Sequence, residues 1–104
     1  PRPWGSYTSP NNKNTLSIRY VNSIFFGPQK IIIKSRKNSL FHYLNTKSYT
    51  TYIDNDGKLL LDHNIQVKWM DNNTAEIKLT GKNQKTQRLL VTFDKAITDK
   101  QERE

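Results

Sequence analysis

One segment near the middle of the chain limits the fold more than any other, the stretch 65–79. Ile65, Val67 and Trp69 alternate with polar residues and lead into a turn at 71–73, whose Asp and Asn residues tolerate left-handed backbone. The same alternation resumes beyond the turn at Ala75, Ile77 and Leu79. A period of two on both sides of a turn is typical of an antiparallel hairpin with one face in the core and one in water. The segment therefore indicates an all-β chain, and it does not by itself indicate a function.

Further short strands are expected on both sides of this hairpin, at 15–21, 30–34, 40–44, 48–53, 58–61 and 89–93. Turn signals separate them. The strongest is Asn55-Asp56-Gly57, because primed hairpin turns require positive φ at their centre. Ser35 to Ser39 is also read as a turn. Since no segment shows a helical period, we predict a small antiparallel β-sandwich or partly open barrel of about seven short strands.

The length of 104 residues predicts one domain. Residues 1–8 are rich in Pro, Gly and Ser and are interpreted as an N-terminal linker, and 9–93 as the β domain. The charged tail 94–104 has only Ala96 and Ile97 to bury, so a short frayed helix or a disordered tail is expected there.

The predicted core consists of the apolar residues on one face of each regular strand. They are Leu16, Ile18, Tyr20, Ile31, Ile33, Ile65, Val67, Trp69, Ala75, Ile77, Leu79, Leu89, Val91 and Phe93. Trp69 is the largest of them, and Trp69→Ala is expected to cost about 3–5 kcal/mol of stability.

The charge of the chain is unusual, at +8 with a pI near 9.8. Residues 1–53 hold eight basic groups and no acidic one, whereas 54–104 hold nine of each. Two interpretations are open: a solvated surface on a Lys- and Asn-rich chain, or a surface for an anionic partner. The densest basic cluster, and the candidate anionic-partner patch, is formed by Lys30, Lys34, Arg36 and Lys37. If it acts as one patch, its members should lie within about one Debye length, roughly 8 Å, of each other.

Residues for catalysis or metal binding do not form a recognisable pattern. The chain has no cysteine, which excludes disulfides, thiol catalysis and thiolate zinc sites. His42 and His63 are the only histidines, and a metal site would need further ligands near them. Asp54 to Gly57 matches the start of a calcium loop, but Ile65 stands where the closing Glu is required. We predict that the protein is not an enzyme and that it has no catalytic, cofactor-binding or metal-binding residue and no cofactor. A small hydrolase with an unrecognised site is a third hypothesis for the function, ranked below two binding roles.

Three pieces of the chain together suggest a relationship: Ser9-Pro10-Asn11-Asn12-Lys13 before a strand, Asn55-Asp56-Gly57, and the segment 67–81. Their order resembles a family of small uncharacterised proteins of Gram-positive bacteria. Members carry an N-terminal membrane anchor or lipoprotein signal followed by a short β-domain of unknown function. The resemblance spans residues 9–93; it departs at Asn12, where the family has Gly, and in the segment 25–28. It implies an extracytoplasmic domain tethered to a membrane through a segment upstream of Pro1.

The leading hypothesis is a non-enzymatic binding or interaction domain of a bacterial membrane-anchored protein or lipoprotein. Its partner would be anionic lipid, a cell-wall polymer or an unidentified protein. The alternative is a basic single-domain nucleic-acid-binding β-protein, because aromatic and basic residues interleave between 25 and 52. The same aromatic residues are also the bulky material available for the core of this half.

Overall fold

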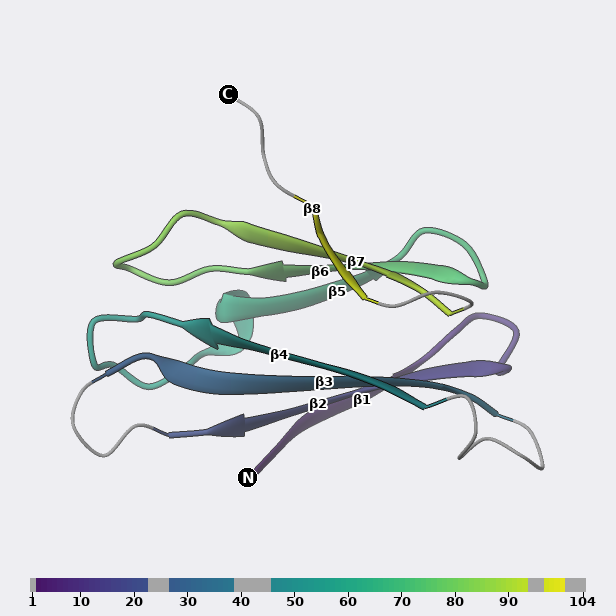
Figure 1. Ribbon diagram of the computed structural model, residues 1–104, viewed down its shortest axis with the longest axis horizontal. Coiled ribbons are helices and arrows are strands. Elements are labelled where there is room, and N and C mark those ends of the chain that lie inside the picture. The colour runs from purple at the N-terminus through teal and green to yellow at the C-terminus, as the bar shows by residue number, and fades with distance from the viewer. Residues whose placement is uncertain (1, 23–26, 39–45, 94–96, 101–104) are drawn as a thin grey trace.

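The computed structural model describes residues 2–22, 27–38, 46–93 and 97–100, which form two sheets packed face to face (Figure 1). Sheet A contains, in spatial order, β1 (Arg2–Thr8), β2 (Asn14–Val21), β3 (Gln29–Lys37) and β4 (Lys47–Ile53). Sheet B contains β5 (Ile65–Trp69), β6 (Thr74–Leu79), β7 (Gln87–Thr92) and β8 (Thr98–Lys100). All neighbouring strands are antiparallel, and the two sheets are not closed into a barrel. The predicted all-β sandwich is therefore confirmed.

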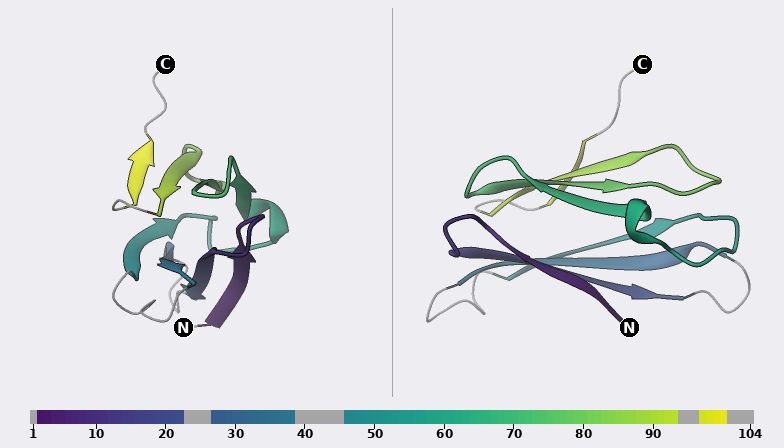
Figure 2. Two further views of the ribbon diagram at one scale, coloured as in Figure 1. Left: turned by 90° about the vertical axis from the view of Figure 1, so that its right-hand side faces the viewer. Right: turned by 180° about the vertical axis from the view of Figure 1, so that it is seen from behind.

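Each sheet is a simple meander made from one half of the chain. The strands of a sheet follow one another in both sequence and space, and a single crossover, residues 54–64, leads from β4 to β5 (Figure 2). This crossover contains the 3₁₀ helix η2 (Asp62–Asn64). Since the two halves of the sequence become the two sheets, the lopsided charge of the sequence becomes a difference between the sheets.

The hairpin 65–79 forms as predicted, with its turn between β5 and β6. Ile65 pairs with Leu79, Val67 with Ile77, and Trp69 with Ala75. Cross-strand partners point to the same face of a sheet, so the apolar set of both strands faces sheet A.

The core lies between the sheets and is formed by the inward residues of the inner strands, with contributions from β4, β5 and the start of the tail. The buried apolar residues are Leu16, Ile18, Ile31, Ile33, Ile53, Ile65, Ala75, Ile77, Leu79, Leu89, Val91, Phe93 and Ile97. Tyr20, Val67 and Trp69 pack against this core and are only partly buried. Trp69 stacks on Phe93 with ring centroids 5.5 Å apart. Its partial exposure lowers the expected cost of Trp69→Ala below that of a fully buried tryptophan.

Residues 2–8 are not a linker, as the sequence had indicated, but the edge strand β1, which pairs with β2. Pro3 and Gly5 disfavour a central strand, but an edge strand tolerates them because one side of its backbone needs no partner. The register shifts between these two residues, as at a β-bulge. Trp4 anchors the strand by an edge-to-face contact with Tyr20.

The expected strand at 58–61 does not form. Leu59 and Leu61 are 73% and 60% exposed, because the chain here crosses from one sheet to the other. Side-chain amides take the place of a strand partner: Gln29 and Asn55 donate to the carbonyl of Lys58, and the backbone N–H of Leu61 donates to Asn64. Three apolar residues in a row were thus a poor indicator of a strand.

Two further boundaries differ from the prediction. The turn expected at 35–39 does not begin at Ser35, because β3 continues to Lys37 in register with β2. In the tail, Thr98–Lys100 pairs with β7 as strand β8 instead of forming a helix, and Ile97 is buried. The sheet offers these residues open hydrogen-bonding groups at the edge of β7, which a helix would leave unused. The strand expected at 40–44, with His42, lies outside the described residues.

Candidate functional site

Three of the four residues of the predicted basic cluster lie on the outer face of sheet A. Lys30, Lys34 and Arg36 occupy even positions of β3 and are exposed, while the odd positions point into the core. Ile32 lies between them on the same face and is half-buried. Successive side chains of a strand point to opposite faces, so this arrangement follows directly from the register of β3.

The row of charges is extended and not compact. Lys30 and Arg36 are six positions apart on the strand, and at about 3.3 Å per residue their backbones lie about 20 Å apart. The expectation that all four groups lie within about 8 Å of each other is therefore wrong; on this face Lys34 and Arg36, about 7 Å apart along the strand, meet it. The reason is that β3 runs straight through 35–37, where a turn had been expected.

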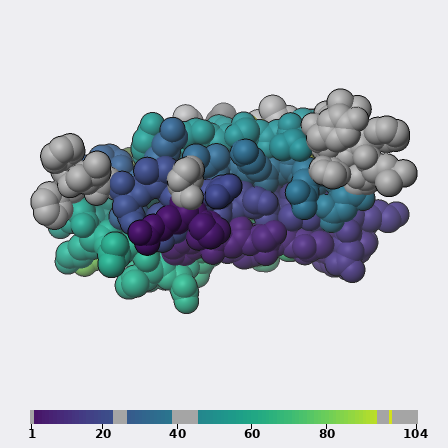
Figure 3. Space-filling view, turned by 90° about the horizontal axis from the view of Figure 1, so that it is seen from below, coloured from purple at the N-terminus to yellow at the C-terminus, as the bar shows by residue number. Residues whose placement is uncertain are grey.

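One further cation and several uncharged polar residues lie around this row. Arg19 of β2 pairs with Ile32 and adds a fourth cation to the face. Hydroxyl side chains flank the row on both neighbouring strands and on β1, at Ser6, Thr8, Thr15, Ser17, Ser48 and Thr50. Tyr52, 54% exposed, pairs with Lys30 at one end. We call this surface, defined by Arg19, Lys30, Lys34 and Arg36 with the six hydroxyl residues, the basic face; Figure 3 views the molecule from this side.

The basic face contains no compensating charge of its own. Residues 1–53, which include all of sheet A, have no Asp or Glu. On the outer face of sheet B, by contrast, Arg88 of β7 lies 3.1 Å from the carboxylate of Glu76 on β6. A uniformly positive surface raises the local concentration of anions and speeds their association.

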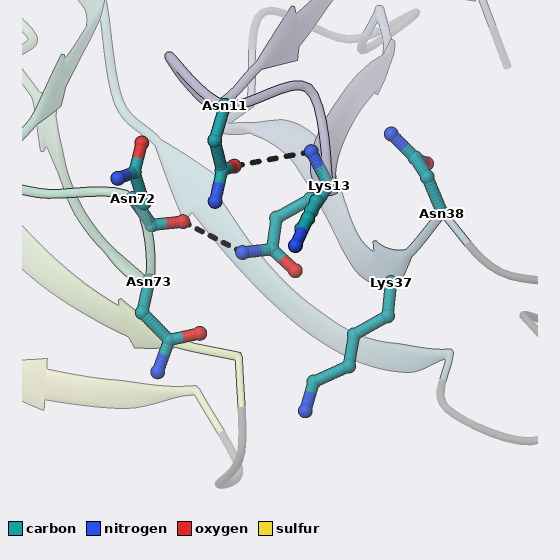
Figure 4. A pocket seen from close by; sticks show the side chains of 7 residues that line it. Asn11, Lys13, Lys37, Asn38, Asn72 and Asn73 are labelled. Atoms are coloured by element: carbon teal, nitrogen blue, oxygen red, sulfur yellow. Dashed lines mark hydrogen bonds between the residues drawn. The ribbon is translucent and has the colours of Figure 1, made fainter.

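Lys37, the fourth residue of the predicted cluster, belongs to a different surface. It occupies an odd, inward position at the end of β3 and lines a pocket of about 510 Å³ at one end of the sandwich (Figure 4). The pocket is lined by Asn11, Lys13, Asn14, Lys37, Asn38, Asn72 and Asn73. The patch predicted from the sequence thus divides into an extended basic face and one member of a pocket.

Other candidate groups do not come together. Among residues 2–22, 27–38, 46–93 and 97–100, no three His, Cys, Asp or Glu side chains form a group that could hold a metal ion. His63 lies in η2 and lines a small cavity with Asn55 and Thr80. Within the part of the chain that the structure describes, no helix is long and apolar enough to cross a membrane.

A second, smaller cluster of cations lies beside the crossover. Hydrogen bonding and charge repulsion from Lys58 lower the pKa of Lys82, partly offset by the carboxylate of Asp56. Unlike the basic face, this pair has an acidic neighbour.

Sequence reasoning located the row on β3 but missed Arg19, the hydroxyl residues and the pocket. The hydroxyl residues could have been found from the alternation of side chains along each strand, once β2, β3 and β4 had been aligned. The pocket could not be found in this way, because its residues come from three separate turns and strand ends, which the sequence indicates only as turns.

Comparisons with protein-family models, curated proteins and solved structures found no match.

Proposed function

We propose that this protein is a non-enzymatic binding domain that holds a linear anionic polymer along the basic face. The observation that carries the proposal is the row of Lys30, Lys34 and Arg36 on one strand, with no carboxylate in the sheet around it. Side chains two residues apart on a strand recur about every 7 Å, so Lys34 and Arg36 can contact successive charged groups of a chain.

The surroundings of the row favour a polymer over a lipid bilayer. Ser17 and Ser48, the cross-strand neighbours of Lys34, are hydroxyl residues that can donate to or accept from polar groups of a bound chain. Among the described residues of this face, the large exposed apolar side chains, which a membrane-binding surface would insert between lipids, are Val21 and Tyr52 at one end. We therefore place a phosphate- or carboxylate-bearing cell-wall polymer first, in the extracytoplasmic location that the sequence resemblance implies.

A nucleic acid is the second candidate. Tyr52 lies exposed beside Lys30, and an aromatic ring next to a cation suits base stacking with phosphate contact. Within the described part of sheet A, however, Tyr52 gives one stacking position, and the other aromatic residues of β1, β2 and β4 pack against the core.

The test compares two variants of equal charge. Lys30→Gln/Lys34→Gln/Arg36→Gln removes three positive charges from the basic face, and the control Lys58→Gln/Lys68→Gln/Lys82→Gln removes three from the other half, so both fall from +8 to +5. Binding is measured by co-sedimentation with purified Gram-positive cell walls, at low and high salt. At about 1 kcal/mol per basic group near an anionic surface, the first variant should bind roughly 100-fold more weakly and the control nearly as well as wild type.

Three further probes decide the class of partner. Cell walls from which phosphodiester polymers have been extracted should lose most of the binding. Vesicles of phosphatidylglycerol and single-stranded DNA should bind more weakly than intact walls at physiological salt. Tighter binding to DNA, with a salt slope that falls by about 2 in the face variant, would replace the proposal by the nucleic-acid alternative. Equal losses in the two charge-matched variants would show that only net charge matters and would contradict a site on the basic face.

A further inference from the structure

The pocket at the end of the sandwich is built where the two sheets meet. Asn11 and Lys13 lie in the turn between β1 and β2, Lys37 ends β3, and Asn72 and Asn73 lie in the turn between β5 and β6. The link between the sheets is the Asn14 carboxamide, whose Nδ2 donates to the backbone carbonyl of Asn72 over 2.6 Å (Figure 4). The pocket therefore exists only when both sheets are docked.

Its walls are fixed by hydrogen bonds within the turns. Ser9 Oγ donates to Asn11 Oδ1 and accepts from the backbone N–H of Asn14, while Asn12 holds a left-handed φ of 61°. Asn38 ties the neighbouring strand end to the same turn, since its backbone N–H donates to the carbonyl of Lys13 over 2.7 Å. A site that is formed before binding loses little conformational entropy when a ligand enters.

The charge of the pocket is positive. Lys13 and Lys37 line it, and no Asp or Glu is among the described residues that line it. Asn14 and Lys37 are cross-strand partners, so the Lys37 side chain starts about 5 Å from the buried carboxamide. The nearest acidic residue in sequence, Asp71, uses Oδ1 to accept the backbone N–H of Asn73 in its own turn.

Neutral hydrogen-bonding groups outnumber the charges. Two amides keep unused capacity among the described contacts: Asn11 Oδ1 accepts two hydrogen bonds while its Nδ2 donates none, and Asn14 Nδ2 donates one while its Oδ1 accepts none. A carboxamide offers both donors and an acceptor, which matches hydroxyl groups that also do both. A simple anion could use the two lysines and the Asn11 N–H groups, but it would leave the Asn14 Oδ1 acceptor without a donor.

From this combination we propose that the pocket binds a sugar that carries one acidic group. Its carboxylate or phosphate would lie between Lys13 and Lys37, and its hydroxyl groups would meet Asn11, Asn14 and the Asn72–Asn73 turn. A volume of about 510 Å³ lies within the usual range for small-molecule sites, and it is ample for one sugar ring with its acidic group. This site is separate from the basic face and does not depend on the function proposed for that face.

The experiment follows backbone amide shifts of the ¹⁵N-labelled protein during titration with four probes: glucuronate, glucose 6-phosphate, glucose and inorganic phosphate. Glucuronate and glucose 6-phosphate should shift the amides of residues 11–14, 37–38 and 72–73 in a saturable way. Each should bind at least tenfold more tightly than glucose or phosphate. Equal affinity for inorganic phosphate and glucose 6-phosphate would overturn the proposal, as would shifts that lie elsewhere.

Two single lysine variants supply a matched control. Lys37→Gln should weaken glucuronate binding at least fivefold and leave the weak glucose response unchanged. Lys68→Gln, at an exposed position of β5 outside both the pocket and the basic face, should leave both unchanged. Asn72→Ala keeps the backbone carbonyl that Asn14 needs and tests the sugar contact without disturbing the fold. A Lys37→Gln protein that binds glucuronate like wild type would contradict the site, whatever the outcome for wall binding by the basic face.

Discussion

The two sheets are alike on the inside and different on the outside. Both are four-stranded antiparallel meanders, and both supply aliphatic residues at alternate positions to one core. On its outer face sheet A has only basic charges, whereas on sheet B the Glu76 carboxylate accepts a hydrogen bond from Arg88. Cross-strand pairs of opposite charge stabilise a sheet, and like charges do the opposite. On sheet B, Glu76 lies directly opposite Lys68 and so offsets positive charge, although Lys78 and Arg88 form a like-charged pair there. Sheet A has no carboxylate to offset its cations, which is why we propose the binding role for sheet A.

The largest expected effects test whether the two sheets form one cooperative unit. Ile33 of sheet A and Ile77 of sheet B are both fully buried, and replacing either by Ala should cost about 2–5 kcal/mol. Trp4 on β1 and Trp69 on β5 provide one fluorescent reporter in each sheet. In each of the Trp4→Phe and Trp69→Phe backgrounds, fluorescence of the remaining tryptophan and far-ultraviolet circular dichroism of the whole protein should give the same denaturant midpoint for a given alanine variant. Two separate midpoints would show that the sheets unfold independently.

A smaller loss is expected from the crossover that joins the sheets. Asn64 is buried, and its side chain accepts from the N–H of Leu61 and donates to the carbonyl of Thr80. Asn64→Ala leaves both backbone groups without these partners and should cost about 1–3 kcal/mol in thermal or denaturant unfolding. Asn83→Ala, at an exposed turn, is the control and should stay within about 0.5 kcal/mol of wild type.

The salt bridge of sheet B should contribute less to the stability of the protein than the hydrogen bonds of Asn64. The Arg88 and Glu76 side chains are 32% and 18% exposed, so solvent screens part of their attraction. Glu76→Gln should destabilise the protein by about 0.2–1 kcal/mol, and the loss should shrink at high salt. A loss that is independent of salt would mean that packing of the side chain matters more than its charge.

The smallest expected effect has the opposite sign and lies on sheet A. Lys34→Gln relieves repulsion from Arg36 and should stabilise the protein by about 0.2–0.5 kcal/mol at low salt. A gain in stability together with weaker binding to cell walls would sharpen the contrast between the sheets. A loss of stability would indicate that the Lys34 side chain stabilises the folded protein.

Regular alternation made much of this fold predictable. The hairpin 65–79 forms with the predicted inward face, and most of the predicted core is buried, because period-2 patterns specify which face of a strand points inward. Strand β1 was missed because Pro3 and Gly5 argue against a strand, and only its position at an edge makes them acceptable. Ile97 was assigned to the charged tail because its burial is not visible in the local pattern. The residue is buried where strand β8 follows it and pairs with the open edge of β7.

The candidate sites were predictable to a lesser degree. The sequence grouped Lys30, Lys34 and Arg36 in one basic cluster, and the alternation of side chains along β3 puts these three on one face. The end of β3 was set too early in the sequence, so Lys37 was grouped with residues of the opposite face. The pocket depends on the docking of two sheets at a contact between Asn14 and Asn72, 58 residues apart, and no local pattern contains that information.

The division of the chain into two consecutive meanders has a consequence for the rate of folding. Each strand pair within a sheet joins neighbours in sequence, so the loops that must close before pairing are short. Most β-sandwiches mix distant strands within a sheet by Greek-key connections, and such non-local pairing slows folding. Here distant residues meet only when the finished sheets dock, through the core and contacts such as Thr51 with Gln87. We therefore expect this chain to fold faster than a Greek-key sandwich of the same length and stability, with docking of the two sheets as its slowest step.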